Sequence, residues 1–226
     1  MPMVQLTEDS AYSEVRAGLY SFLAALALTP IPTDESEYAA NLVDALNQLP
    51  EVDEQDSLFE GIQVLKQFAA DTAQISTEDL GRVQTSLAVD RTRLFRGLQP
   101  KQKPDPPFES VFRPTSQLNQ RLLDVVNAYS DAGLRAIIPS GERGDYVGVE
   151  LKFMACLCAK ESEVSGEELE ATLQQEHHFL TEHLLRWVPK FCKQMLDAAE
   201  TEFFRGIALI LLAFLDQEAA MFAPTP

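Results

Sequence analysis

The stretch from Tyr12 to Leu26, YSEVRAGLYSFLAAL, indicates the fold class of the whole chain. Its apolar residues return every three or four positions, at Val15, Leu19, Phe22, Leu23 and Leu26. This is the period of an α-helix with one apolar face. Thr29-Pro30 then ends the helix, because a proline disfavours helical backbone at the residue before it.

The same period recurs along most of the 226 residues. It predicts helices at 35–49, 55–73, 115–129, 147–158, 169–184 and 201–221. Ser76-Thr-Glu-Asp79 and Ser165-Gly-Glu-Glu168 both resemble capping boxes that begin helices, and Pro189 is expected in the first turn of a further helix. No stretch alternates with period two. The sequence therefore predicts an all-α protein, a single-domain bundle of about nine helices.

A connector rich in proline divides the helical pattern. Residues 97–114 hold five prolines, and so long an irregular segment is unusual between two helices. We expect N-terminal helices within 7–95, a connector at 96–114 and C-terminal helices within 115–222, all in one domain covering 1–226.

The charge balance restricts the partners that the protein can bind. Lys and Arg number 18 against 35 Asp and Glu, a formal net charge of -17. Such a surface repels phosphate backbones and anionic lipid and attracts basic partners. We therefore expect no nucleic-acid partner, although solubility alone would also account for the acidity.

Cysteines and apolar runs favour the cytoplasm. The three cysteines are an odd number in a chain of this size, which is typical of reduced thiols. The first residues alternate charged and apolar groups, unlike the apolar core of a signal peptide. The run from Ile207 to Leu215 is too short to span a bilayer, so no stable membrane insertion is expected.

Motifs for catalysis are absent from the sequence. Neither a GxSxG nucleophile elbow nor a glycine-rich nucleotide loop occurs. His177, His178 and His183 are close in sequence, but their spacings of one, five and six place no pair on one helical face. We expect no catalytic or metal-binding residue and no cofactor. The alternative is a metal- or small-molecule-dependent enzyme that uses this histidine cluster.

Apolar residues also gather where the helical period breaks. Leu94-Phe95 precede the connector, and Pro106-Pro-Phe-Glu-Ser-Val-Phe112 lies inside it. Aromatic residues on irregular surface segments are candidates for recognition. Equally, Phe95, Phe108 and Phe112 would serve to pin the connector onto the core. Glu142 and Asp145 flank a helix start, where acids either complement the helix dipole or form an acidic rim for a basic partner.

These segments carry a family resemblance. The chain resembles the TorD/DmsD family of redox-enzyme maturation chaperones, which serve molybdoenzymes exported by the twin-arginine route. The matching stretches, in order, are Arg91-Thr-Arg-Leu-Phe95 with Gly97, Pro106-Pro-Phe-Glu-Ser-Val111, Gly144-Asp-Tyr-Val-Gly-Val-Glu-Leu-Lys-Phe-Met-Ala155, Glu176-His-His-Phe-Leu-Thr-Glu-His-Leu-Leu-Arg-Trp187, Phe191 and Phe203-Phe-Arg-Gly206.

Two family motifs are matched in part. The first is an aromatic residue, two further residues and Leu-Phe, which Leu94 and Phe95 match while Arg91 replaces the aromatic. The second is an acidic residue, a short gap and Asp-His. Glu142 and Asp145 match it, and Tyr146 stands where histidine is usual.

The resemblance implies a client-binding role. We expect a cytoplasmic chaperone that binds the catalytic subunit of a molybdoenzyme, its twin-arginine leader peptide or both, as a monomer or a segment-swapped homodimer. A leader has a basic start and an apolar stretch, so its receptor needs carboxylates beside apolar groups. The expected client-binding residues are Leu94, Phe95, Phe108, Glu109, Glu142, Asp145, Tyr146 and Glu150. A permanent structural subunit of a complex is a further alternative.

Overall fold

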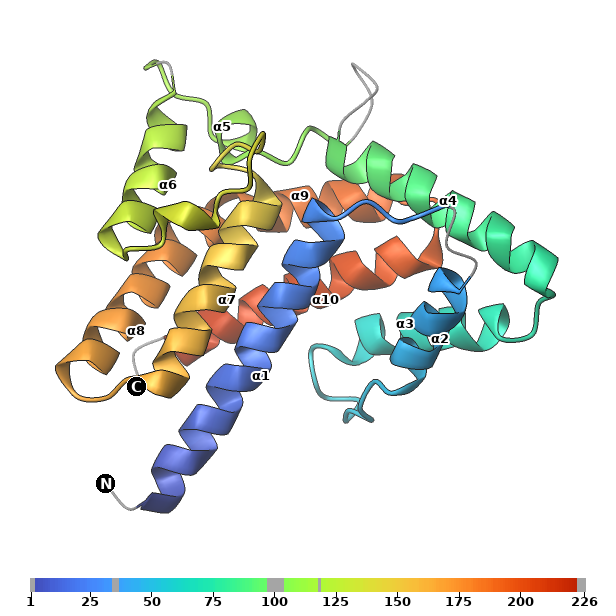
Figure 1. Ribbon diagram of the computed structural model, residues 1–226, viewed down its shortest axis with the longest axis horizontal. Helices are drawn as coiled ribbons and strands as arrows, with labels where there is room; N and C mark the ends of the chain where they lie inside the picture. Colours follow the sequence, from blue (N-terminus) through green and yellow to red (C-terminus); the bar gives the residue numbers. More distant parts are fainter. Residues whose placement is uncertain (1–2, 34–36, 97–103, 118, 223–226) are drawn as a thin grey trace. The chain divides into compact units, whose positions relative to one another are not determined.

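The computed structural model describes residues 3–33, 37–96, 104–117 and 119–222. This part of the chain contains helices and no named strand, which confirms the all-α prediction (Figure 1). It divides into two compact units, each built from separate stretches of chain. Unit 1 contains 3–28 and 108–188, and unit 2 contains 29–107 and 189–222. Residues 97–103 of the expected connector lie outside the described residues, and the single domain stays a prediction.

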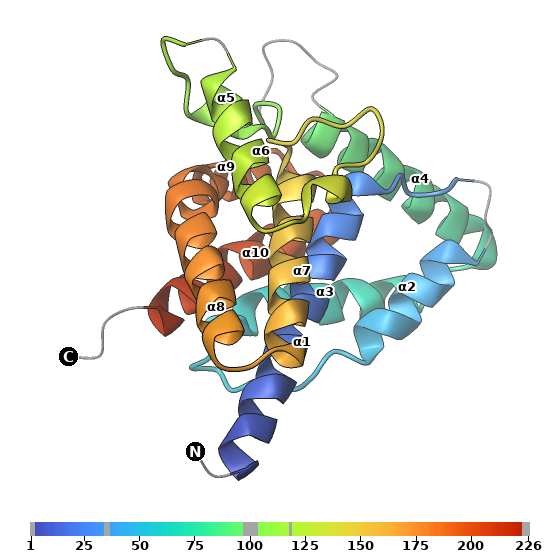
Figure 2. The ribbon, with the colours of Figure 1, turned by 60° about the vertical axis from the view of Figure 1, so that its left-hand side comes forward.

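Two long helices form the centre of unit 1. Helix α1 (Met3–Leu28) packs along α7 (Val147–Glu163), as Figures 1 and 2 both show. The helices approach closely at Gly148, where a Cβ atom would lie 2.8 Å from Cγ of Leu28. The hydroxyl of Tyr146 donates a hydrogen bond of 2.8 Å to the Ala27 carbonyl at the same contact.

The remaining helices of unit 1 include a short one inside the expected connector, at 109–112, where the sequence predicted no helix. They are the short α5 (Glu109–Phe112), α6 (Gln120–Asp131), a 3-10 turn (Arg135–Ile137) and α8 (Glu167–Phe179).

The buried face of α1 differs from the predicted one. Val15 is 68% exposed and Phe22 is 38% exposed. The helix buries Arg16 instead, which forms ion pairs of 2.6 Å with Glu161 and with Glu176. A buried guanidinium must face its carboxylates, because an unpaired charge there costs several kcal/mol, on the order of a whole core side chain. This pairing sets the rotation of α1 and leaves part of the apolar stripe in solvent.

Unit 2 contains the other helices. They are α2 (Tyr38–Asn47), α3 (Phe59–Thr72), α4 (Thr77–Arg96), the C-terminal part of α9 (Leu185–Ala198) and α10 (Glu202–Met221). The buried Asp90 carboxylate accepts hydrogen bonds from the backbone N–H and the hydroxyl of Thr201, both 2.8 Å. This contact ties α4 to the start of α10.

Helix boundaries follow the sequence signals in part. The Ser76 hydroxyl accepts a hydrogen bond from the Asp79 N–H (3.2 Å) and donates one to its carboxylate (2.8 Å), which confirms that capping box. The second capping prediction is wrong. Helix α8 begins at Glu167, and its capping residue is Gly166 at φ +61, a conformation that favours glycine, with no side-chain cap.

The position of Pro189 also differs from the prediction. Helix α8 continues through a π-helical turn (Leu180–Leu184) into α9, and Pro189 lies inside α9. In the π-turn the Leu185 N–H bonds to the Leu180 carbonyl, five residues earlier. A proline inside a helix presses on the carbonyl four residues before it, here that of Leu185. The π-turn ends at Leu184, one residue before the carbonyl that the proline disturbs.

No helix in the described part of the chain combines the length and the apolar content that crossing a membrane requires.

Gly61 provides a test of the α3–α10 packing. An added Cβ would lie 2.6 Å from Cγ1 and 2.9 Å from the backbone N of Ile210. We expect Gly61→Ala to lower the free energy of unfolding by about 1–3 kcal/mol, measured by urea denaturation. The control is Gly81→Ala in α4, where nothing lies within 4 Å and alanine should add about 0.5–1 kcal/mol. An equal increase in the free energy of unfolding in both variants would contradict this close packing of α3 against α10.

Candidate functional site

Two motif segments meet in unit 1. The backbones of Phe108 and Tyr146 form an antiparallel bridge, and the Glu109 N–H donates a 2.9 Å hydrogen bond to the Asp145 carbonyl. The Phe108 ring packs on the Tyr146 ring with centroids 5.4 Å apart. The end of the connector is therefore held against the start of α7, and four of the expected client-binding residues come together there.

Asp145 is bound by its own chain. Its carboxylate is fully buried and accepts two hydrogen bonds of 2.9 Å from the Arg143 guanidinium, a forked ion pair. The same guanidinium lies 5.1 Å from the centroid of the Phe108 ring and donates to the Ser110 hydroxyl. The negative charge of Asp145 is therefore neutralised within unit 1.

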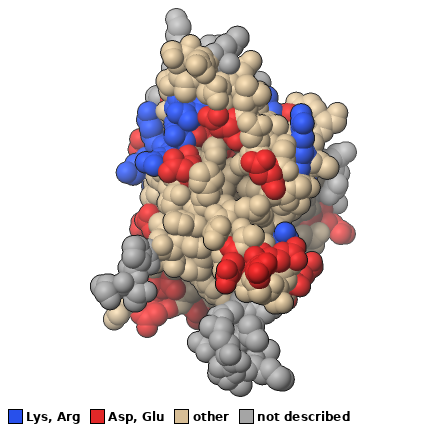
Figure 3. Space-filling model, turned by 90° about the vertical axis from the view of Figure 1, so that its left-hand side faces the viewer, with Lys and Arg blue, Asp and Glu red and all other residues tan. Residues whose placement is uncertain are grey.

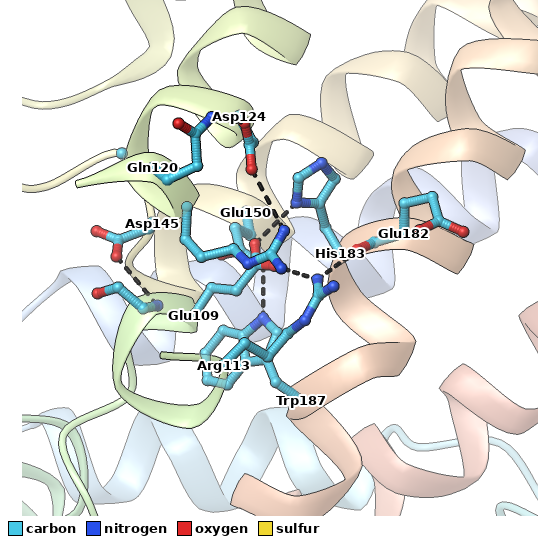
Figure 4. A network of polar contacts seen from close by, with 12 residues as sticks. Glu109, Arg113, Gln120, Asp124, Asp145, Glu150, Glu182, His183 and Trp187 are labelled. Carbon is cyan, nitrogen blue, oxygen red and sulfur yellow. Dashed lines mark hydrogen bonds and ion pairs between the residues drawn. The ribbon is translucent and has the colours of Figure 1, made fainter. Parts of the chain in front are cut away.

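Glu109 is the centre of a second network, drawn in Figure 4. This fully buried carboxylate lies 2.8 Å from Nδ1 of His183 and forms an ion pair with Arg113 one turn further along. Arg113 also donates a hydrogen bond of 2.5 Å to the Glu182 carbonyl in the π-turn. The π-turn thus supplies both a ring nitrogen and a backbone oxygen to the network that anchors α5.

Glu150 lies beside this network, but its carboxyl group has only one hydrogen-bond partner among the described residues. One carboxyl oxygen accepts a 3.0 Å hydrogen bond from the Trp187 indole, and the other has no hydrogen-bond partner in the described part of the chain. Burial raises the pKa of Glu150 well above its ordinary value, and the charge of Glu109 raises that pKa further. Burial therefore favours the neutral form of this carboxyl group, which avoids the cost of burying an unpaired charge.

Most of the expected client-binding residues are buried. Glu109, Asp145, Tyr146 and Glu150 lie in the interior of unit 1, whereas Phe108 and Glu142 are half-buried at its surface. Leu94 and Phe95 belong to unit 2 and are also buried. The structure thus brings six of the eight together in one unit, and a role of any of them in client binding stays a prediction.

Phe95 packs within the aromatic core of unit 2. Its ring centroid lies 5.8 Å from that of Phe191 and 6.0 Å from that of Phe204. This favours the alternative in which Phe95 pins the end of α4.

Sequence reasoning did not identify Arg113, His183 and Trp187 as members of this site. All three bind carboxylates that the motifs contain. His183 and Trp187 lie one helical turn apart within a motif stretch. This spacing places both donors on one face of the helix, and it was the sequence signal that could have predicted them as partners of the acidic motif residues. His183 is held by Glu109, and the described residues contain no group of three or more His, Cys, Asp or Glu side chains placed to hold a metal ion.

A groove opens beside the Glu109 network. We call it the α6–α8 groove: it has a volume of about 660 Å³, with walls from α6 and α8 and an apolar floor at Phe153 and Phe179. Its lining residues are Arg113, Arg121, Asp124, Asn127, Ala128, Asp131, Phe153, Ala171, Gln174, Gln175, His178, Phe179, Glu182 and His183. All of them belong to unit 1.

The raised pKa of Glu150 predicts a pH-dependent stability. The folded chain keeps this group protonated above the ordinary glutamate pKa of 4.5, where the unfolded chain ionises it. Stability from this group is therefore complete at acid pH and falls as the pH rises, by up to about 1.4 kcal/mol per pH unit. Glu150→Gln should flatten the fall between about pH 5 and pH 7, measured by urea denaturation. The exposed Glu170→Gln is the control, and parallel curves for Glu150→Gln and the wild type would contradict the raised pKa.

The burial of Phe95 predicts how much stability the chain loses when this ring is removed. The side chain is 4% exposed, so Phe95→Ala should lower the free energy of unfolding by about 3–5 kcal/mol, measured by chemical denaturation. Phe22→Ala, at a ring 38% exposed, is the matched control and should cost under about 1 kcal/mol. Similar small losses in both variants would instead support a surface role for Phe95.

Comparisons with known proteins agree with the family resemblance seen in the sequence. The family model described as nitrate reductase delta subunit matches residues 55–193. The chaperone protein TorD of Vibrio parahaemolyticus is 24% identical over 95% of this chain and 98% of its own length. TorD of Photobacterium profundum is 26% identical over 95% and 97%.

A shorter match points to the same class of protein. The perchlorate reductase assembly chaperone of Dechloromonas aromatica is 31% identical over 47% of each chain. These relatives are chaperones and not catalytic enzymes. The chain therefore belongs to the nitrate reductase delta subunit family, that of the TorD/DmsD redox-enzyme maturation chaperones.

Proposed function

We propose that this protein is a cytoplasmic chaperone that binds a molybdoenzyme subunit before its export, through the twin-arginine leader peptide, the apo form of the subunit or both. The family match over 55–193, joined by TorD relatives that align along almost the whole chain, is the observation that carries the proposal. The mechanism is stoichiometric binding, which shields the client and delays export until its cofactor is loaded.

Charge supports a basic client. The chain has a net charge of -17, and the field of such a surface raises the rate at which a basic segment meets it. A leader peptide with arginines before an apolar stretch fits this field better than a nucleic acid or an anionic lipid does. The attraction is screened by salt, because exposed charges lose their influence beyond a Debye length of about 10 Å.

The motif residues act at two levels in this proposal. Phe108 and Glu142 are half-buried, and they are the members of the set in unit 1 that a client can reach. Glu109, Asp145 and Glu150 hold the surrounding backbone in place through Arg113, Arg143 and Trp187. Their contribution to binding is therefore to the shape of the surface, and contact with the client falls to their exposed neighbours.

Titration calorimetry tests the proposed function. The full chain is titrated with twin-arginine leader peptides from molybdoenzymes of the same genome, and with the corresponding apoenzymes. We expect at least one to bind below about 100 μM, which corresponds to roughly -5.5 kcal/mol. The same leader with both arginines replaced by glutamine is the control, and it should bind more weakly, with the difference shrinking at high salt. The absence of binding by every leader and every apoenzyme would contradict the proposal.

A further inference from the structure

We propose that the α6–α8 groove is a peptide site that binds a short extended segment of the client, with the basic end of the segment at Asp131. This inference rests on the proposed function and specifies where on unit 1 the client is held and in which direction it runs. It is carried by the unpartnered groups of the groove walls, the apolar floor and the unequal charges of its two ends.

The groove walls offer the groups that an extended backbone needs. Asn127 on α6 and Gln174 and Gln175 on α8 line the groove, and none of their side chains has a hydrogen-bond partner in the described part of the chain. Each amide carries both a donor and an acceptor. An extended peptide presents unpaired N–H and C=O groups, so amides on both walls match its backbone whatever its sequence.

The base of the groove and the alanines above it provide the apolar part of the contact. Phe153 and Phe179 form the floor, packed together with ring centroids 4.6 Å apart. Both rings are only 1% exposed, so they form the base of the groove and offer little surface of their own. The methyl groups of Ala128 and Ala171 provide apolar surface above them and leave the space open. Alternate side chains of an extended segment would point toward this floor, which favours apolar residues there.

The two ends of the groove differ in charge. Arg113, Arg121 and His183 lie at the end next to the π-turn, together with the acids Asp124 and Glu182, which are paired with Arg121 and Arg186. The Nε atom of Arg121 is buried without an acceptor in the described part of the chain. Asp131 closes α6 at the other end, where the carbonyl ends of the helix add negative potential. Asp131 has no ion-pair partner among the described residues. Figure 3 shows this side of the molecule, where most basic side chains lie in the upper half with acidic ones beside them, and further acidic side chains lie in the lower half.

These charges select the direction of the segment. Arg113 and Arg121 are already paired with Glu109 and Asp124, so the π-turn end offers N–H donors to peptide carbonyls more than a free positive charge. Asp131 is the unpaired charge of the groove, and it attracts a cation. A leader therefore binds with its arginines at Asp131 and with its apolar stretch running over the floor toward Arg121.

The length of the groove limits the number of client residues that it can hold. From Arg121 to Asp131 the helix rises about 15 Å, at 1.5 Å per residue. An extended chain advances about 3.3 Å per residue, so about four or five residues of the client fit between the two ends.

Blocking the groove is the first test. Ala171 is exposed on the wall of α8, and Ala171→Trp fills the space above the floor without disturbing the core. We expect this variant to bind the leader peptide at least about tenfold more weakly than the wild type, measured by calorimetry. The control is Ala159→Trp, at an exposed alanine of α7 outside the groove, which should bind as the wild type does. Thermal unfolding of both variants verifies that they are folded.

Reversing a charge tests the direction. Asp131→Lys should weaken binding of the leader about fivefold, the size of an exposed ion pair, and should favour a leader whose two arginines are replaced by glutamate. Asp44→Lys on α2 makes the same change in net charge away from the groove and is the control. A preference of Asp131→Lys for the glutamate leader, absent in Asp44→Lys, supports the assigned direction.

The outcomes separate this inference from the proposed function. If the leader binds the wild type, and if Ala171→Trp and Asp131→Lys bind it as tightly as their controls do, the groove is not the peptide site, while the chaperone function stands. If the wild type binds neither leader nor apoenzyme, the proposed function fails and the inference fails with it.

Discussion

The pairing of the buried Glu109 carboxylate is the interaction on which unit 1 depends most. A fully buried carboxylate is tolerated only when hydrogen bonds and opposite charges replace its lost water. His183 and Arg113 provide this replacement, and each comes with a structural condition. Arg113 requires α5 to extend one turn beyond Glu109, and His183 requires the π-turn to face α5. The short helix and the irregular turn are thus parts of one arrangement.

The neighbouring carboxyl groups satisfy the same constraint by different means. Asp145 is paired with Arg143, an arginine two residues away, whereas Glu150 accepts a hydrogen bond from the Trp187 indole and burial raises its pKa. Because Glu109 already carries a charge in this region, a second ionised group without its own cation would be repelled. Three acids that look equivalent in the sequence therefore differ in the groups that pair with them.

The sequence predicted the fold class better than it predicted the site. Helical period and the Ser76 cap depend on residues close in the chain, and both are confirmed. The rotation of α1 depends on Arg16 meeting Glu161 and Glu176 more than a hundred positions away, which no local pattern contains. Likewise, the motif showed that Glu109 and Asp145 are acidic, but their burial follows from partners that only the folded chain brings near them.

The burial of these acids bears on how an acidic chaperone presents its charge. Most of the acidic side chains behind the net charge of -17 are exposed or half-buried, whereas Glu109 and Asp145 are buried and paired with Arg113 and Arg143. These buried motif residues hold the nearby backbone and aromatic groups in place. They can do so only while their internal ion pairs stay intact, so they are poorly suited to pair with a client. The surface that meets a client must then use groups that folding leaves unpaired. In unit 1 such groups are found along the α6–α8 groove, where the amides of Asn127, Gln174 and Gln175 and the carboxylate of Asp131 keep their hydrogen-bonding capacity for another chain.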